Sequence, residues 1–197
     1  MSRSRFLMGV KVKLHLEEDH ATAHISVIKS GAVSKKPGAL RIRPAVKSDM
    51  PALIALDEEI TGFAKRKYWK ETFSGYRVRP RLPRFLLVAE DGGRIEGFII
   101  GEVRAWEFGE PPCGWIFAVQ VRPRTRLRGV GTQLFEVLCD AFRRAGVMKV
   151  RTIMARDNHL VLSFFRSQGM MAGPFIELET ALDGENAKER LHEAAKS

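Results

Sequence analysis

The stretch from Val121 to Phe135 reads VRPRTRLRGVGTQLF and places four arginines directly before two glycines and a helical apolar pattern. The first turn of an α-helix exposes backbone N–H groups at the positive end of the helix dipole, and glycine lets a ligand approach the backbone closely. The residues that would supply this access, a hydroxyl and positive charge are Gly129, Gly131, Thr132, Arg126 and Arg128. In this order they indicate a site for a phosphate group.

The same residues exclude two common kinds of nucleotide site. The phosphate loop of nucleotide hydrolases ends in Gly-Lys-Ser/Thr, whereas Thr132 and Gln133 follow Gly131. A dinucleotide fingerprint needs a glycine where Leu134 stands. Taken alone, the two glycines also fit an ordinary strand-to-helix turn with solvated arginines around it.

The stretch resembles the Val-x-Pro-x-x-Arg-x-x-Gly-x-Gly corner of the Gcn5-related N-acetyltransferase superfamily. The matching residues are Val121, Pro123, Arg126, Gly129 and Gly131. Farther along, DNHLVLSFFRSQGM resembles the family's second motif, through Asn158, Phe165, Gly169 and Met170. The opening LRIRPAVKSDMPALIAL looks like its first strand and helix, so the resemblance runs from about Leu40 to Leu178.

The resemblance implies an acyl-CoA N-acyltransferase-like fold, with coenzyme A in a cleft between two splayed strands, here 115–121 and 149–155. Pantetheine would pair with the main chain of Val119, Gln120 and Val121. The pyrophosphate would bind the main-chain N–H groups of Leu127, Arg128, Gly129, Val130, Gly131 and Thr132. Arg126 and Arg128 would neutralise the phosphates, Arg122 and Arg124 would face solvent or the 3′-phosphate, and Asn158 and Phe165 would complete the coenzyme site.

The resemblance also implies an activity: transfer of an acetyl group from acetyl-CoA to a primary amine of a small molecule or protein, by direct attack in a ternary complex. The Val119 N–H is the expected donor to the thioester carbonyl. The sequence departs from the family's pattern at two places, because its tyrosine acid falls at Phe165 and a glutamate base found in some members falls near Trp115. Glu102 is the nearest candidate base, and a solvated surface glutamate is the competing interpretation.

Two other functions stay open. The departures at Phe165 and Trp115 also fit a catalytically silent acyl-CoA-binding regulator. The run KRKYWKETFSGYRVRPRLPR interleaves basic residues with Tyr68, Trp69 and Tyr76, a composition that also suits stacking on single-stranded nucleic acid. No RNA-binding motif or zinc finger accompanies that run, so nucleic-acid binding is the weaker alternative.

Composition limits the setting of the protein. The 197 residues carry a formal net charge of +10, which favours anionic partners, and two cysteines, which do not make a disulfide framework. We find no apolar run long enough for a membrane span and no signal-peptide pattern, so we expect a soluble cytoplasmic protein. The histidines lack metal-ligand spacing, and we expect no metal.

Three segments make up the chain. Residues 1–38 alternate apolar and polar positions on either side of EEDH and end in SGAVSKKPGA, which predicts a β-hairpin extension and a linker. A lone hairpin is barely stable, so it must pack on the main domain or on a second subunit, as in a homodimer. Residues 39–180 form the main domain, and 181–197 a helical tail.

Within the main domain, strands and helices are mixed. Strands are expected near 40–45, 85–90, 94–107, 115–121, 147–155 and 173–179, and helices near 47–60, 130–145 and 158–168. The run 64–84 is expected to form a short helix and an exposed loop. Ser48 or Asp49 is the expected N-cap of the first helix, and Gly146 the stop of the third. Some strands are joined by tight turns and others by helices, which predicts an α/β (α+β mixed) fold with a central mixed sheet flanked by helices.

Overall fold

A computed structural model describes residues 40–75, 82–105 and 109–180. The predicted hairpin within 1–38 and the predicted tail 181–197 lie outside the described residues. The described chain divides into two compact units, the first ending at Ala155 and the second beginning at Arg156. Each unit is described by itself.

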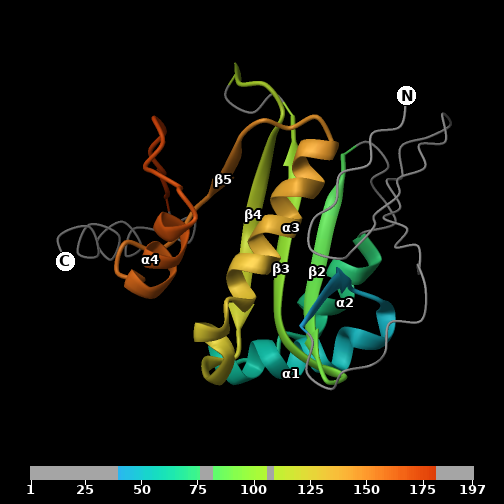
Figure 1. Ribbon diagram of the computed structural model, residues 1–197. Coiled ribbons are helices and arrows are strands. Elements are labelled where there is room, and N and C mark those ends of the chain that lie inside the picture. Colours follow the sequence, from blue (N-terminus) through green and yellow to red (C-terminus); the bar gives the residue numbers. More distant parts are fainter. Residues whose placement is uncertain (1–39, 76–81, 106–108, 181–197) are drawn as a thin grey trace, which may run out of the picture. The chain divides into compact units, whose positions relative to one another are not determined.

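A five-stranded sheet forms the centre of the first unit (Figure 1). Its strands lie side by side in chain order: β1 (Arg41–Pro44), β2 (Arg84–Asp91), β3 (Arg94–Arg104), β4 (Cys113–Val121) and β5 (Val150–Thr152). The first four are antiparallel neighbours, whereas β5 runs parallel to β4. The predicted mixed sheet is confirmed.

Helices cover the two faces of this sheet (Figure 1). A short 3-10 turn, η1 (Lys47–Asp49), leads into α1 (Met50–Thr61), and α2 (Arg66–Gly75) follows. A second 3-10 turn, η3 (Pro123–Arg128), joins β4 to α3 (Val130–Arg144), which packs against β2, β3 and β4. Gly146 has a φ of 78°, so the left-handed turn expected after α3 is confirmed.

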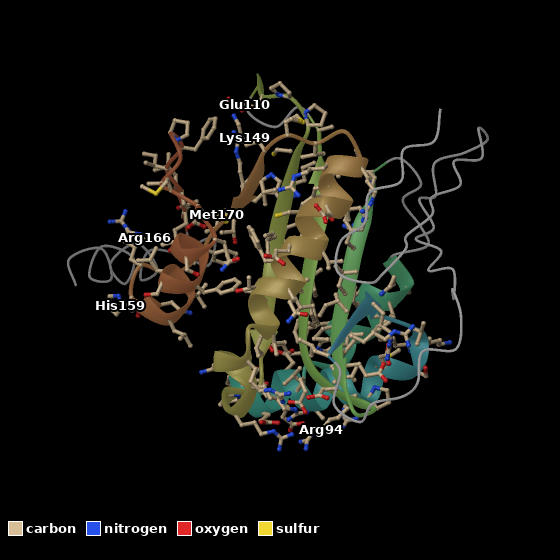
Figure 2. All side chains as sticks on the ribbon, viewed as in Figure 1. Arg94, Glu110, Lys149, His159, Arg166 and Met170 are labelled. Carbon is tan, nitrogen blue, oxygen red and sulfur yellow. The ribbon has the colours of Figure 1, made fainter. Side chains whose placement is uncertain are left out.

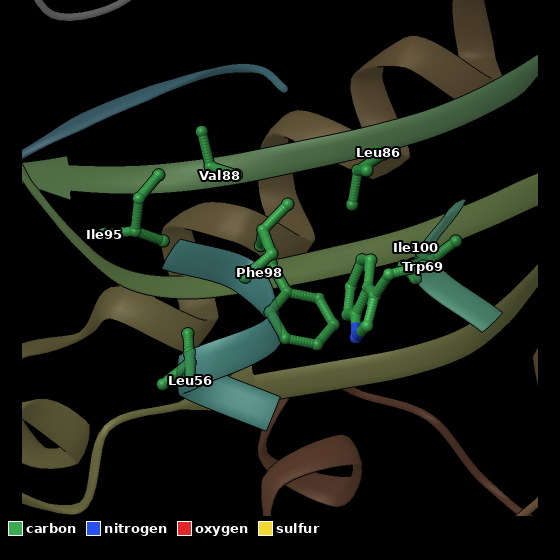
Figure 3. Packing of buried hydrophobic residues seen from close by; sticks show 8 residues of the cluster. Leu56, Trp69, Leu86, Val88, Ile95, Phe98 and Ile100 are labelled. Atoms are coloured by element: carbon green, nitrogen blue, oxygen red, sulfur yellow. The ribbon is translucent and has the colours of Figure 1, made fainter. Parts of the chain in front are cut away.

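The core between α1, α2 and the sheet explains how the first two helices are held (Figure 3). Leu53 and Leu56 of α1 pack with Val88 of β2 and Phe98 of β3. Trp69 of α2 is fully buried in the same cluster, with its ring edge-on to that of Phe98 at 5.0 Å between centroids. Trp69 is therefore not available to stack on nucleic-acid bases, because its apolar ring fills the core beneath α2.

The opposite face is closed by α3. The ring of Phe142 is fully buried and lies edge-on to Phe85 at 5.4 Å between centroids. Cys139 is buried on the same helix, and desolvation raises the pKa of its thiol above the usual 9.0. Cys139 therefore behaves as a small apolar side chain on the buried face of α3.

Asp49 occupies the N-cap position of α1, as the sequence predicts, but its side chain does not cap the helix. Its carboxylate accepts two hydrogen bonds from the Arg43 guanidinium, at 2.6 and 2.9 Å, and one from the Val46 N–H at 2.8 Å. Asp49 therefore ties the start of the helix back to β1.

The second unit contains α4 (His159–Ser167). Gly169 follows the helix with a φ of 80°, as predicted for its end. The strand predicted over 173–179 is wrong: these residues form no regular element, and Phe175, Ile176 and Leu178 are exposed. A strand needs a neighbour to pair its backbone, and no described strand pairs with this segment.

Candidate functional site

The edge of β4 that faces β5 is open along much of its length. On its other side β4 pairs with β3 over Cys113–Val121, but the register with β5 covers Gly114–Ile116 against Val150–Thr152. The Thr152 hydroxyl donates to Ile116 O at 3.0 Å where this pairing ends. Beyond that point no described strand lies beside residues 117–121 on this edge, so their outward backbone groups lack a ladder partner. The predicted residues Val119, Gln120 and Val121 lie there.

A bulge in β4 lies where the two strands part. Ile100 pairs with Ala118 and Gly101 with Ile116, so Phe117 has no partner on β3. Its side chain is 45% exposed. The guanidinium of Arg104 lies over the rings of Phe117 and Trp115, at 4.7 and 5.1 Å from their centroids. The bulge therefore presents an aromatic surface with a stacked cation.

The glycine corner lies at the end of β4, at the N-terminus of α3. Gly129 is the N-cap residue with a φ of 72°, a left-handed conformation that favours glycine. A Cβ built on Gly129 would meet no atom within 4 Å, so the backbone is open to approach there. Val130 and Gly131 are buried behind it. The fifteen-residue α3 thus directs the N–H groups of its first turn, including that of Thr132, toward an accessible corner.

The four arginines before this corner differ in their contacts. Arg126 Nε donates to Val121 O at 3.2 Å, and Arg128 forms an ion pair of 3.0 Å with Asp91 at the end of β2. Both side chains are exposed beside Gly129. They remain the predicted phosphate partners, and their contacts tie η3 to β4 and to the β2–β3 turn.

Arg122, by contrast, is buried, so the expectation that it faces solvent or a phosphate is wrong. It forms ion pairs with Glu59 of α1 and Glu96 of β3 and donates to Ile95 O at 3.3 Å. Burial lowers the pKa of its guanidinium, and the charge of Arg124 lowers it further. Arg124 is more exposed and donates to Glu96 at 3.2 Å. Arg122 therefore anchors the end of β4 to α1 and β3.

A second charge cluster lies at the other end of the sheet from Arg94, which pairs with Glu96 (Figure 2). There Glu110 accepts hydrogen bonds from Lys149 at 2.7 Å and Arg151 at 2.8 Å. These partners, Lys149 first, lower the pKa of the Glu110 carboxyl. The cluster joins the loop before β4 to the start of β5.

The candidate base Glu102 lies on β3 opposite Trp115. One carboxylate oxygen contacts Arg84 at 2.6 Å and the other contacts Arg104 at 3.0 Å. Along β4, Trp115 precedes Val119 by four residues, a separation of roughly 13 Å in an extended strand. Glu102 is thus a doubly paired carboxylate near the bulge rather than a solvated surface glutamate.

Sequence reasoning missed one buried polar group, which lies on the face of the sheet that α1 covers. Asp57 of α1 is buried, and its carboxylate accepts hydrogen bonds from Trp69, Lys65 and Gln120. The signal in the sequence was its position four residues after the buried Leu53, on the apolar stripe of the helix. The Gln120 side chain thereby connects α1 to the open strand.

The two remaining coenzyme-site candidates belong to the second unit. Asn158 is the N-cap of α4, and its Oδ1 accepts a hydrogen bond from the Val161 N–H at 3.2 Å, as its type predicts. Phe165 is buried with its ring 5.1 Å from that of Phe164. Both side chains therefore have structural roles within this unit.

The described residues contain no group of three or more His, Cys, Asp or Glu side chains arranged to hold a metal ion. None of the described helices has the length and apolar character needed to cross a membrane.

Comparison with known proteins decides the family. Residues 50–170 match the Acetyltransferase (GNAT) family. The chain belongs to this family. A relative of this GNAT chain, the L-2,4-diaminobutyric acid acetyltransferase of Nocardia farcinica (strain IFM 10152), is 30% identical over 118 residues. That match covers 57% of this chain and 60% of the relative.

Solved GNAT structures share the fold. An aminoglycoside N-acetyltransferase in complex with CoA superposes with a TM-score of 0.65 at 15% identity, over 76% of this chain and 99% of that one. An aminoglycoside 6'-N-acetyltransferase from Acinetobacter baumannii superposes with a TM-score of 0.63 at 16% identity, over 74% of this chain and 100% of that one. Glucosamine-6-phosphate N-acetyltransferase from Arabidopsis thaliana superposes with a TM-score of 0.58 at 22% identity, over 74% of this chain and 99% of that one. The predicted family and fold class are confirmed.

Proposed function

We propose that this GNAT chain is an N-acetyltransferase that moves the acetyl group of acetyl-CoA to a primary amine. The observation that carries the proposal is the continuity of an open strand edge and an open helix N-terminus. On the edge of β4 away from β3, residues 117–121 have no described strand beside them. The chain continues from Val121 through η3 (Pro123–Arg128) into the corner at Gly129, eight residues later. One extended ligand with a phosphate end fits both.

The corner would hold the pyrophosphate. Main-chain N–H groups over 127–132 and the positive end of the α3 dipole favour an anion there. Side-chain charge would come from Arg126 and Arg128, both exposed beside the open backbone of Gly129. Sheltered contacts of this charge-assisted kind are worth about 1.5–3 kcal/mol each, and less when exposed.

The pantetheine arm would then run along β4, pairing with the main chain of Val119, Gln120 and Val121. Support for this comes from the missing ladder partner on that edge. Bound there, the coenzyme brings its thioester toward the bulge at Phe117. A role for Asn158 and Phe165 in coenzyme binding rests on the family resemblance.

The chemistry needs few protein groups. The neutral amine attacks the thioester carbon, a C–N bond forms, the C–S bond breaks, and the thiolate leaves with the electron pair. A thiol with a pKa of about 8.5 leaves moderately well without a general acid, which makes the phenylalanine at 165 tolerable. The Val119 N–H would stabilise the developing oxyanion. Glu102 lies opposite Trp115, roughly 13 Å along β4 from Val119, so the ammonium proton would pass to it through intervening water molecules. Glu102 must give up one of its arginine contacts to accept the proton.

The acceptor is proposed to be an amine, on a small molecule or a protein. The family's relative is named for diaminobutyric acid, and the neighbouring structures for aminoglycosides and glucosamine-6-phosphate. All of these compounds carry primary amines. They therefore form the first panel of acceptors.

A catalytically silent acyl-CoA-binding regulator is the second candidate. It is favoured by Phe165 in place of a tyrosine acid and by Glu102 held between two arginines. Nucleic-acid binding loses support, because Trp69, one of the three aromatic residues proposed to stack on bases, is buried.

Calorimetry with acetyl-CoA on the wild type, Gly129→Val and Gly146→Val tests the proposal. Both glycines have left-handed φ values and open space, at opposite ends of α3, so both substitutions cost similar stability. We expect Gly129→Val alone to lose affinity, by at least about tenfold, equal to ~1.4 kcal/mol. Equal affinities in all three proteins would refute the site.

Thiol release with the acceptor panel then separates the two candidates. Turnover with any amine supports the enzyme. Tight acetyl-CoA binding with no turnover across the panel supports the regulator.

A further inference from the structure

A buried carboxylate links α1, α2 and β4 on the face of the sheet opposite α3. The Asp57 side chain is 3% exposed. Its Oδ2 accepts a hydrogen bond from Trp69 Nε1 at 2.9 Å, and its Oδ1 accepts from Lys65 Nζ at 3.1 Å and Gln120 Nε2 at 3.0 Å. A negative charge this deeply buried requires a compensating cation.

The amide that contacts Asp57 leaves an acceptor unused. Gln120 Oε1 is buried and has no hydrogen-bond partner in the structure. A buried carbonyl without a donor is unfavourable, and most such groups find one. The same amide contacts Oδ1 through its Nε2, so a carboxylate oxygen and an unpaired carbonyl oxygen belong to one connected group. Together they suit a donor that has several N–H bonds.

The cation on Asp57 is held less firmly than the other two donors. Trp69 is locked in the core, and Gln120 lies within β4. Lys65 lies in the connection between α1 and α2, and its side chain is 40% exposed. A lysine ammonium is a hydrated point charge on a flexible stem, so another ammonium could replace it from solvent without moving either element.

We propose that Asp57 and Gln120 bind the ammonium group of the acceptor amine, and that Lys65 Nζ occupies this site until the acceptor replaces it. The inference rests on the proposed function, because it names the site for that reaction's acceptor. Gln120 follows Val119 on β4, so the site adjoins the strand assigned to pantetheine. A primary ammonium offers three N–H donors, enough for Asp57 Oδ1 and Gln120 Oε1.

Thermal unfolding of the full chain tests the site without the reaction. Lys65→Met leaves Asp57 without its cation, so we expect a lower melting temperature than that of the wild type. Methylammonium chloride should raise the melting temperature of Lys65→Met by about 2–4 °C, the shift that a stabilisation of ~1 kcal/mol gives a domain of this size. Tetramethylammonium chloride at equal ionic strength has no N–H donor and should restore nothing.

Asp57→Asn/Lys65→Met is the matched control, because it removes the carboxylate as well. Methylammonium should not raise the melting temperature of this double variant. Equal shifts in the single and double variants, or no shift in the single variant, would overturn the proposal. These melts contain no acetyl-CoA, so their failure is distinguishable from failure of the coenzyme site.

Kinetics with an accepted amine provide a second readout. If the Lys65–Asp57 ion pair only stabilises the fold, loss of either residue should impair the enzyme. If Asp57 binds the acceptor, the two substitutions should change the acceptor KM in opposite directions: Lys65→Met lowers it and Asp57→Asn raises it. If Lys65→Met does not fold, Lys65→Arg replaces it. A bidentate guanidinium is harder to displace, so Lys65→Arg should raise the acceptor KM about tenfold. An unchanged KM in Lys65→Arg, or changes of the same sign in the other two variants, would contradict the site.

Discussion

The ring of Phe142 lies against the backbone of Gly114, so that a Cβ on Gly114 would come within 2.7 Å of two ring carbons. Phe142 is fully buried on α3, and its ring also packs edge-on against Phe85. Gly114 is also the first residue of β4 that pairs with β5. This contact sets the spacing between α3 and the strand where the open edge begins.

Gly114→Ala should therefore destabilise the protein. We expect a loss of about 1–3 kcal/mol in the free energy of unfolding, typical of overpacking a filled core. Urea denaturation measures it. Gly173→Ala is the control, because a Cβ at Gly173 meets no atom within 4 Å and should change stability little. Equal stability of both variants would show that the sheet and α3 can move apart freely.

Two arginines four residues apart should give opposite phenotypes. Arg126→Gln removes an exposed guanidinium beside Gly129, so we expect up to about tenfold weaker acetyl-CoA binding with stability within about 0.5 kcal/mol of the wild type. Arg122→Gln breaks buried ion pairs with Glu59 and Glu96, so we expect a loss of about 1–3 kcal/mol in stability. Calorimetry and urea denaturation of both variants check this, and a stable Arg122→Gln with weakened coenzyme binding would reverse the assignment.

The Arg43–Asp49 pair predicts a pH dependence. Burial would raise the pKa of Asp49, but hydrogen bonds from Arg43 and the Val46 N–H, with the charge of Arg43, outweigh it and lower the pKa below the usual 3.8. The unfolded chain then binds the proton more readily than the folded one. The stability from this carboxylate is complete above pH 3.8 and is lost as the pH falls through the lower folded pKa.

Asp49→Asn should accordingly cost about 1–3 kcal/mol at pH 7 and progressively less at acidic pH. Denaturation curves at pH 7 and at pH 2 measure the difference in the free energy of unfolding between the variant and the wild type. Asp140→Asn, at a more exposed ion pair with Arg143, is the control and should cost little at either pH. A cost for Asp49→Asn that stays constant down to pH 2 would contradict the proposed linkage.

Glu102→Gln tests the proposed base. A general base contributes about 10²–10⁴ to the rate, so we expect kcat/KM at neutral pH to fall about a hundredfold while acetyl-CoA affinity stays unchanged. Glu110→Gln, another carboxylate held by two cations, is the control and should retain activity. If Glu102→Gln lowers only stability, the carboxylate serves to hold Arg84 and Arg104.

The sequence by itself determined the local features of this protein. Helix and strand periods identified α1, α3 and the β2–β3 hairpin, because one face of each is buried. Two glycines, Gly129 and Gly131, with arginines at alternate positions before them, located the Gly129 corner. The N-cap role of Asn158 follows from its residue type, because such a cap depends on neighbouring backbone alone.

Tertiary structure decided which similar residues do different things. The alternate spacing of the four arginines does not indicate which of them is buried, yet Arg122 is buried because Glu59 and Glu96, distant in sequence, meet at its side chain. Trp69 lies in a basic segment and Asp57 is a charged residue on an otherwise apolar helix stripe, and the packing of α1 and α2 on the sheet buries both. The expected strand over 173–179 failed for the same reason, because a strand depends on a neighbouring strand and not on its own residues.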